Sequence, residues 1–377
     1  MENAKISTYQ LFVLILLFEM GSSLVIGTGI SAKQDAWLAT LGGMVGGLFL
    51  FLIFYKIYQY YPGTSPLDIY KTAFGKFLGW IIGFAYASYF LYIAARVLRD
   101  LGEMLVTVSY SETPLLVINF IMICGVLYGV RKGIEVIART GEILFSFLYV
   151  LAVVGFILII FSQLIDVSKL KPVLEHGLTP VLKSIYSETL YVPYGETVVF
   201  MALFPYIKET KKIKPIGISA ITLSGINLAL TMVINIAVLG IDANERSPFP
   251  LLSTIQEIRI AEFLERLDVF FMLALVVGGF FKISIYFYAS LTFYAQLFKI
   301  DRYQNIAYPL TLIVLCMSIM EATSYAEHIE EGLRLVPFYF HIPFQIIIPV
   351  ILLVTIFIKV KWKKRKVKQR GAQSTMS

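Results

Sequence analysis

Long apolar stretches alternate with short polar segments along this chain of 377 residues. Most of the stretches approach or exceed the roughly 20 residues that an α-helix needs to cross the hydrocarbon of a bilayer. Lipid offers no hydrogen-bond partners, so only a structure that satisfies its own backbone is expected there. The pattern predicts an all-α integral membrane protein with ten transmembrane helices, at residues 8–30, 36–56, 77–106, 115–130, 142–163, 186–206, 216–240, 266–298, 305–321 and 337–359.

The composition supports a chain that lies mostly within the bilayer. Hydrophobic residues make up 58% of it and charged residues only 15%, whereas soluble domains carry about a quarter charged residues. The segments between the stretches are short, so we expect one transporter-like transmembrane domain over residues 1–377. The two cysteines, Cys124 and Cys316, both lie inside predicted spans and supply neither a disulfide framework nor a metal site.

The positive charges predict the orientation of the chain. The formal net charge is +7, and Lys and Arg are concentrated in alternate loops and in a basic tail at 360–377. By the positive-inside rule, both termini are expected in the cytoplasm, which requires an even number of spans. A basic cluster directly after an apolar span is typical of a cytoplasmic stop in contact with anionic lipid, so we expect no nucleic-acid partner.

Two of the predicted spans contain residues that interrupt helices. The first has Gly21-Ser22-Ser23 near its middle, and the sixth has Pro193 and Gly195 in the run Tyr-Val-Pro-Tyr-Gly-Glu-Thr. Proline removes a helical hydrogen bond, and glycine tolerates unwound dihedrals. Breaks at matching positions of two five-helix halves predict an inverted repeat with a binding site at the midplane. The alternative interpretation is a pair of ordinary kinks.

Charged residues inside predicted spans are candidates for function, because burying them in lipid is expensive. Glu19 lies close to Gly21, Glu196 lies in the break of the sixth span, and Lys282 lies deep in the eighth. Either carboxylate is suited to a ligand cation, a proton or Lys282. Arg99 and Glu103 are four residues apart, and we expect a structural pair rather than a ligand contact.

Other intramembrane residues have a simpler interpretation. Tyr92 and Tyr194 lie deep enough by count to line a cavity, although most tyrosines in such proteins serve the interface or packing. The four glycines of the second span form overlapping Gly-x-x-x-Gly pairs, which predict a close helix-packing face: Gly42, Gly43, Gly46 and Gly47.

No enzyme signature is present in the sequence. A Walker A loop, a Gly-x-Ser-x-Gly elbow and a His-Glu-x-x-His helix are all absent, and the three histidines are widely separated. We therefore expect no catalytic residue, no metal site and no cofactor.

An ordered series of short motifs resembles a known family, the B subunits of spore germinant receptors, or endospore germination permeases. The similarity runs from about residue 5 to residue 360. Its motifs are Lys-Ile-Ser-Thr-Tyr-Gln-Leu-Phe at 5–12, Gly21-Ser22-Ser23, Ala-Lys-Gln-Asp-Ala-Trp at 32–37, Tyr61-Pro62, Ala-Ala-Arg-Val-Leu-Arg-Asp at 94–100, Pro-Val-Leu at 172–174 with Gly177, Phe204-Pro205 and Glu265-Arg266.

The resemblance implies a fold, a location and partners. The family belongs to the amino acid–polyamine–organocation superfamily, which implies a LeuT-like five-plus-five inverted repeat with broken helices 1 and 6. It implies a place in the inner membrane of the bacterial endospore, beside an A subunit and a lipoprotein C subunit. Members are thought to bind a small germinant, often an amino acid, and to signal the exit from dormancy.

The resemblance also implies a pocket. Gly21, Ser22 and Ser23 would offer unwound backbone amides to a ligand carboxylate. The facing break, Val192, Pro193, Tyr194 and Gly195, would offer carbonyls to an amine, with Tyr92 and Lys282 as weaker candidates for the walls.

The sequence departs from proton-coupled relatives in one respect, because its fifth span lacks a lysine at a coupling-ion site. This favours a sensor that binds without pumping. An amino-acid permease that works by alternating access remains the alternative, since both functions use the same pocket.

Overall fold

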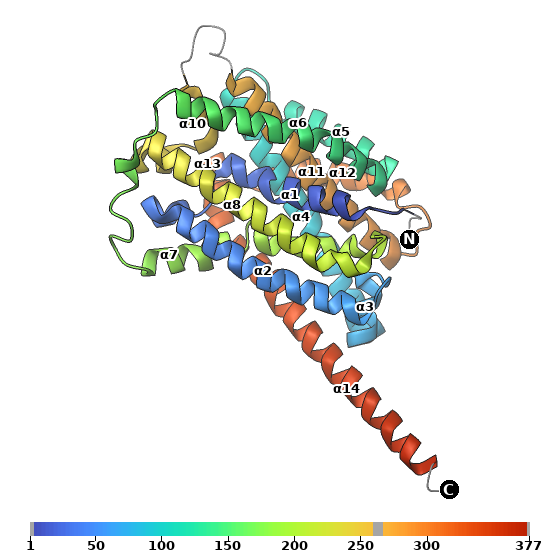
Figure 1. Ribbon diagram of the computed structural model, residues 1–377. Coiled ribbons are helices and arrows are strands. Elements are labelled where there is room, and N and C mark those ends of the chain that lie inside the picture. The colour runs from blue at the N-terminus through green and yellow to red at the C-terminus, as the bar shows by residue number, and fades with distance from the viewer. Residues whose placement is uncertain (1–3, 259–266, 375–377) are drawn as a thin grey trace.

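The computed structural model describes residues 4–258 and 267–374, and these form a bundle of helices (Figure 1). Glu265 and Arg266, which belong to the motif series above, lie outside the described residues. In Figure 1 the N-terminus lies at one end of the bundle and the short helices α7 and α10 at the other. The last helix, α14, extends beyond the bundle toward the C-terminus.

Most of the expected spans are helices in the structure. Among the described residues, eight helices are long and apolar enough to cross a membrane, or nine if α12 and α13, bent by 100° at their junction, form one span. The long helices are α1 (Thr8–Ile26), α2 (Ala36–Tyr60), α4 (Lys76–Val108), α5 (Leu115–Lys132), α6 (Ile134–Phe161), α8 (Ile213–Leu239), α11 (Leu267–Leu297), α12 (Gln304–Met320) and α14 (Ile348–Ser374), which continues the π-helical segment η8 (Pro337–Ile347).

Shorter elements connect these helices. They are η1 (Ile30–Asp35), α3 (Pro66–Phe74), η2 (Val167–Leu170), α7 (Thr179–Ser184), η3 (Ile185–Thr189), η4 (Tyr194–Ala202), η5 (Phe204–Tyr206), η6 (Thr210–Lys212), α9 (Ile241–Arg246), α10 (Pro250–Gln256) and α13 (Tyr325–Arg334). Ile6 and Ile207 form an isolated parallel bridge, which ties the start of the chain to the end of η5.

The expected break at Gly21-Ser22-Ser23 is wrong. Helix α1 begins at a capping box of Ser7 and Gln10 and runs without interruption to Ile26, before Gly27 at a φ of 75°. The reason for the glycine is close packing against α11: a Cβ on Gly21 would lie 3.0 Å from the carbonyl oxygen of Gly278. Glycine here permits two helices to meet at their backbones, as small residues do in membrane interfaces.

The expected break in the sixth span is confirmed. Residues 185–206 run through a π-helical turn, an irregular segment at Pro193, and two 3₁₀ segments, η4 and η5. Proline has no N–H to donate, so an α-helical bond cannot form at Pro193. The chain instead bonds Gly195 N to the carbonyl of Leu190 at 3.0 Å. This irregular segment places Glu196 among the helices around it.

The glycine-rich face of α2 is a packing surface, as predicted, and its partner is the broken segment. A Cβ on Gly43 would overlap Thr189, and a Cβ on Gly47 would overlap Tyr194. The hydroxyl of Thr189 also donates to the carbonyl of Ala39 at 2.8 Å. The irregular backbone of residues 185–206 is therefore held directly against a regular helix.

Candidate functional site

Lys282 of α11 lies at the centre of the bundle and is fully buried. Its Nζ is 2.5 Å from Oε2 of Glu196 in η4, and it donates to Oγ of Ser22 in α1 at 2.9 Å. The ammonium group also lies 5.2 Å from the ring centroid of Phe18, in range of a cation–π interaction. One cation thus links three elements that are far apart in the sequence.

Glu19 lies on the same helix as Ser22 and is also fully buried. The hydroxyl of Ser224 in α8 donates to its Oε2. Within the described residues, Oε1 of Glu19 has no hydrogen-bond partner. A buried carboxylate with a free oxygen is expensive to maintain. The interior therefore carries two carboxylates, Glu19 and Glu196, for the one ammonium group of Lys282.

The other residues predicted for the pocket are placed by α1 and the broken segment. Ser23 is buried, and its hydroxyl has no partner among the described residues. Tyr194 is buried against α2, and Val192 donates its N–H to the carbonyl of Glu188 at 3.2 Å. The backbone amides of residues 21–23 lie within the regular helix α1, so they are not the unwound donors that the sequence suggested.

A second polar group, which sequence reasoning missed, lies against Gly195. Nε2 of Gln345 donates to the hydroxyl of Tyr89 at 2.9 Å and lies 3.0 Å from Nδ1 of His341. The hydroxyl of Tyr89 is in turn 2.9 Å from the same His341 nitrogen. A Cβ on Gly195 would overlap Gln345. The available signal was a histidine and a glutamine inside an apolar span, with His341 between Pro337 and Pro343 and Gln345 two residues after Pro343.

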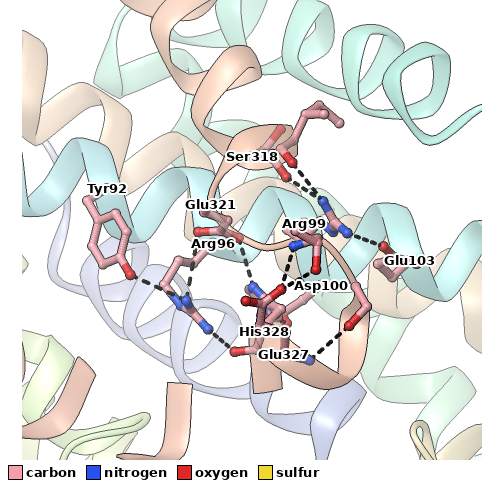
Figure 2. Close-up of polar contacts among 12 residues, drawn as sticks. Tyr92, Arg96, Arg99, Asp100, Glu103, Ser318, Glu321, Glu327 and His328 are labelled. Carbon is pink, nitrogen blue, oxygen red and sulfur yellow. Dashed lines mark hydrogen bonds and ion pairs between the residues drawn. The ribbon is translucent and has the colours of Figure 1, made fainter. Parts of the chain in front are cut away.

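A third cluster connects α4 to the corner between α12 and α13 (Figure 2). Oδ1 of Asp100 lies 2.8 Å from Nε2 of His328, and Oε1 of Glu321 lies 2.8 Å from Nδ1. Nη2 of Arg96 donates to the carbonyl of His328 at 2.6 Å, and its Nη1 lies 3.8 Å from Glu321. These side chains are almost completely buried.

The protonation state of His328 follows from this geometry. A neutral imidazole has one N–H, whereas both nitrogens here face carboxylate oxygens, so only the imidazolium can donate to both. Burial lowers the pKa of His328, but the carboxylate of Asp100 and the hydrogen bonds with Asp100 and Glu321 outweigh burial, so the pKa lies above its ordinary value. With His328 charged, two cations balance two anions.

The predicted pair of Arg99 and Glu103 is confirmed, with 2.8 Å between Nη2 and Oε1. Nη1 of Arg99 also donates to the carbonyls of Ser318 and Ile319, each at 3.2 Å, which caps the end of α12 (Figure 2). Tyr92 belongs to this region too, because its hydroxyl accepts from Nη1 of Arg96 at 3.3 Å. Tyr92, Arg99 and Glu103 therefore belong to the cluster at the α12–α13 corner and not to the cluster around Lys282.

No group of three or more histidine, cysteine or acidic side chains in the described ranges is arranged to hold a metal ion. The clusters around Lys282 and around His328 contain cations beside carboxylates, and the cluster at Gly195 contains an amide, a hydroxyl and an imidazole. Such groups bind small polar molecules through ion pairs and hydrogen bonds.

A family model and individual relatives point to the same family. A family model described as spore germination protein matches residues 5–326. Spore germination protein KB of Bacillus subtilis (strain 168) is 50% identical over 375 residues, which cover 99% of this chain and 100% of the relative. Spore germination protein A2 of the same organism is 25% identical over 294 residues, covering 75% of this chain and 78% of the relative.

Solved structures of transporters resemble the whole bundle. MhsT in complex with L-phenylalanine superposes with a TM-score of 0.70 at 11% identity, covering 93% of this chain and 89% of that chain. Mhp1, a nucleobase-cation-symport-1 family transporter, gives 0.65 at 11% identity, covering 85% and 73%. At these identities the likeness shows the fold alone, which is that of LeuT-type transporters.

Proposed function

The chain belongs to the spore germination protein family, and on that premise we propose that it is a membrane subunit of a germinant receptor. It binds a small nutrient germinant inside the bundle and signals through partner subunits. The observation that carries this proposal is the buried group of Lys282, Glu196 and Ser22, which joins α11, the broken segment and α1. Charges at such depth are retained in membrane proteins chiefly for function.

The geometry favours a zwitterionic germinant such as an amino acid. Its carboxylate would pair with Lys282 and accept from Ser22, and its ammonium group would pair with Glu196 or Glu19. The ligand would thus replace the direct ion pair of 2.5 Å by two ion pairs. Because α1 is regular at Gly21, side chains take the role that unwound amides would have had.

Signalling follows if the ligand binds one packing of the bundle more tightly than another. The change in the free-energy difference between the two packings can be no larger than the difference between the ligand's binding free energies for them. The proposed partners are an A subunit and a lipoprotein C subunit. The proposed location is the inner membrane of the bacterial endospore.

We further propose a ten-span topology with both termini in the cytoplasm. The eight apolar helices, with the broken segment 185–206 and α12 as two further spans, give ten. The single domain over residues 1–377 would then be a five-plus-five inverted repeat, with its basic tail against anionic lipid.

The test compares germination and uptake in spores that carry Lys282→Gln. We expect loss of the response to the germinant, with normal amounts of the receptor in the membrane. Lys56→Gln is the matched control, since Lys56 lies on the surface of α2. A normal response in Lys282→Gln would contradict the pocket.

The second candidate function is an amino-acid permease, and the likeness to transporters favours it. Labelled germinant should show no net uptake into vesicles that contain the parent chain alone. Saturable uptake by the parent chain that is lost in Lys282→Gln would contradict the receptor function and support the permease function.

A further inference from the structure

An apolar cavity of about 300 Å³ lies beside α1, on the flank between α6 and α8. Leu17, Met20 and Gly21 of α1 form its floor together with Gly278 of α11. Helix α1 contacts both α6 and α8, and in Figure 1 it is seen between them. The cavity therefore reaches from the side of the bundle to the Gly21–Gly278 contact.

The lining is unsuited to water. Three of the polar side chains in it are Asn227, Thr231 and Tyr149. The hydroxyl of Thr231 already donates to the carbonyl of Asn227 at 2.9 Å, and Nδ2 of Asn227 contacts the sulfur of Met20 at 3.7 Å. A buried water needs two to four polar partners, and most of this surface is apolar.

The rim of the cavity lies on the surface of the bundle. Tyr149 and Val153 of α6 are 36% and 46% exposed, and Leu230 of α8 is 43% exposed. All three also line the cavity. Both helices are apolar enough to cross a membrane, so hydrocarbon surrounds this rim.

We propose that the cavity binds one acyl chain of a bilayer lipid. A flexible hydrocarbon chain matches the lining and enters from the surrounding membrane. An empty cavity would forfeit the dispersion contacts of its lining.

The inner end of the site is adjacent to the buried ion pair. Gly21 precedes Ser22, and Gly278 lies one helical turn before Lys282. A Cβ on Gly21 would lie 3.2 Å from the carbonyl carbon of Gly278 and 3.3 Å from Cβ of Lys282. An acyl chain in the cavity thus contacts the close packing of Gly21 in α1 against Gly278 in α11, whichever ligand binds at Lys282.

The test uses tryptophan fluorescence of the full chain in vesicles of phospholipid with brominated acyl chains. The background replaces Trp37, Trp80 and Trp362 by Phe. Met20→Trp then reports from the floor of the cavity, Val154→Trp from the exposed face of α6, and Phe287→Trp from the fully buried interior. We expect brominated chains to quench Met20→Trp as strongly as Val154→Trp, and Phe287→Trp far less.

Filling the cavity supplies the second measurement. Ala152→Phe places a ring in the lining of the cavity, whereas Ile157→Phe changes the exposed face of the same helix. We expect Ala152→Phe to reduce the quenching of Met20→Trp to the level of Phe287→Trp, and Ile157→Phe to leave it unchanged. Quenching of Met20→Trp no stronger than that of Phe287→Trp would overturn the proposal. Quenching by aqueous acrylamide in place of brominated lipid would overturn it as well, because the cavity would then hold water.

Discussion

The carboxylate of Asp100 in α4 lies 2.8 Å from Nε2 of His328 in α13. This contact joins the C-terminal half of a long helix to a short helix that follows it by more than 200 residues in the sequence. Glu321 approaches the other ring nitrogen at the same distance. The imidazolium therefore holds the α12–α13 corner against α4, and the strength of this connection depends on pH.

We expect the thermal stability of the solubilised protein to fall as the pH rises above neutrality. The pKa of His328 is raised in the folded state, so its contribution to stability is complete below the unfolded pKa of about 6.5. That contribution is lost as the pH rises through the higher, folded pKa. The measurement is the unfolding temperature between pH 6 and 9 for the parent and for His328→Gln.

The variant should unfold at lower temperature near pH 6 and show a flatter dependence on pH. His176→Gln is the control, because His176 is exposed. Parallel curves for the parent and His328→Gln would show that His328 does not titrate in this range.

The buried pair of Lys282 and Glu196 should show strong coupling in a double-mutant cycle. Lys282→Met leaves Glu196 as an uncompensated buried charge, and breaking a buried pair in this way costs about 3–5 kcal/mol. Lys282→Met combined with Glu196→Gln should recover part of the loss, since the side chain of Glu196 is then neutral and only the carboxylate of Glu19 remains buried beside it. The free energy of unfolding is measured for the parent, both single variants and the double variant.

The exposed pair of Lys212 and Glu209 supplies the matched cycle. Its atoms are 2.6 Å apart, but the side chains are 58% and 54% exposed. Removing either partner should change stability by less than about 1 kcal/mol. Similar coupling energies for the two cycles would mean that Lys282 is hydrated in the membrane.

The arrangement of helices could be predicted from sequence more fully than the site. Long apolar runs indicate segments that lie in the hydrocarbon of the membrane. Pro193 identified a broken span because proline has no N–H for the helical hydrogen bond. Gly21 was ambiguous, since glycine serves both unwound backbone and close packing. Only the position of Gly278, more than 250 residues away, decides between the two.

The polar clusters were likewise predictable only where their partners lie close together in the sequence. Arg99 and Glu103 were recognisable as a pair because they are one turn apart on one helix. His328 and Asp100 meet only through the bend of 100° between α12 and α13. A bend of this kind leaves no periodic signal in the sequence, so the contact between these two residues was not predicted.

The packing of α2 against the broken segment predicts a steep cost for a single methyl group. A Cβ on Gly47 would overlap both Cβ and Cγ of Tyr194, and overpacking of this kind costs about 1–3 kcal/mol. Gly125→Ala in α5 is the control, because no described atom lies within 4 Å of the added Cβ. Unfolding temperatures are compared, and equal values for Gly47→Ala and Gly125→Ala would contradict the close contact.

Gly195→Ala should alter the response to the germinant while the bundle remains folded. The new methyl group would displace Gln345, a flexible side chain that is able to move away from its bonds with Tyr89 and His341. If the displaced amide is what disturbs the pocket, the double variant with Gln345→Ala relieves the overlap with Gln345 and leaves the bond of 2.9 Å between Tyr89 and His341 in place. The added Cβ then keeps a close contact of 3.0 Å with the carbonyl oxygen of Leu190. Germination is measured against germinant concentration for Gly195→Ala, Gln345→Ala and the double variant. We expect the double variant to match Gln345→Ala, and a double variant as impaired as Gly195→Ala would place the effect in the backbone at Gly195 itself.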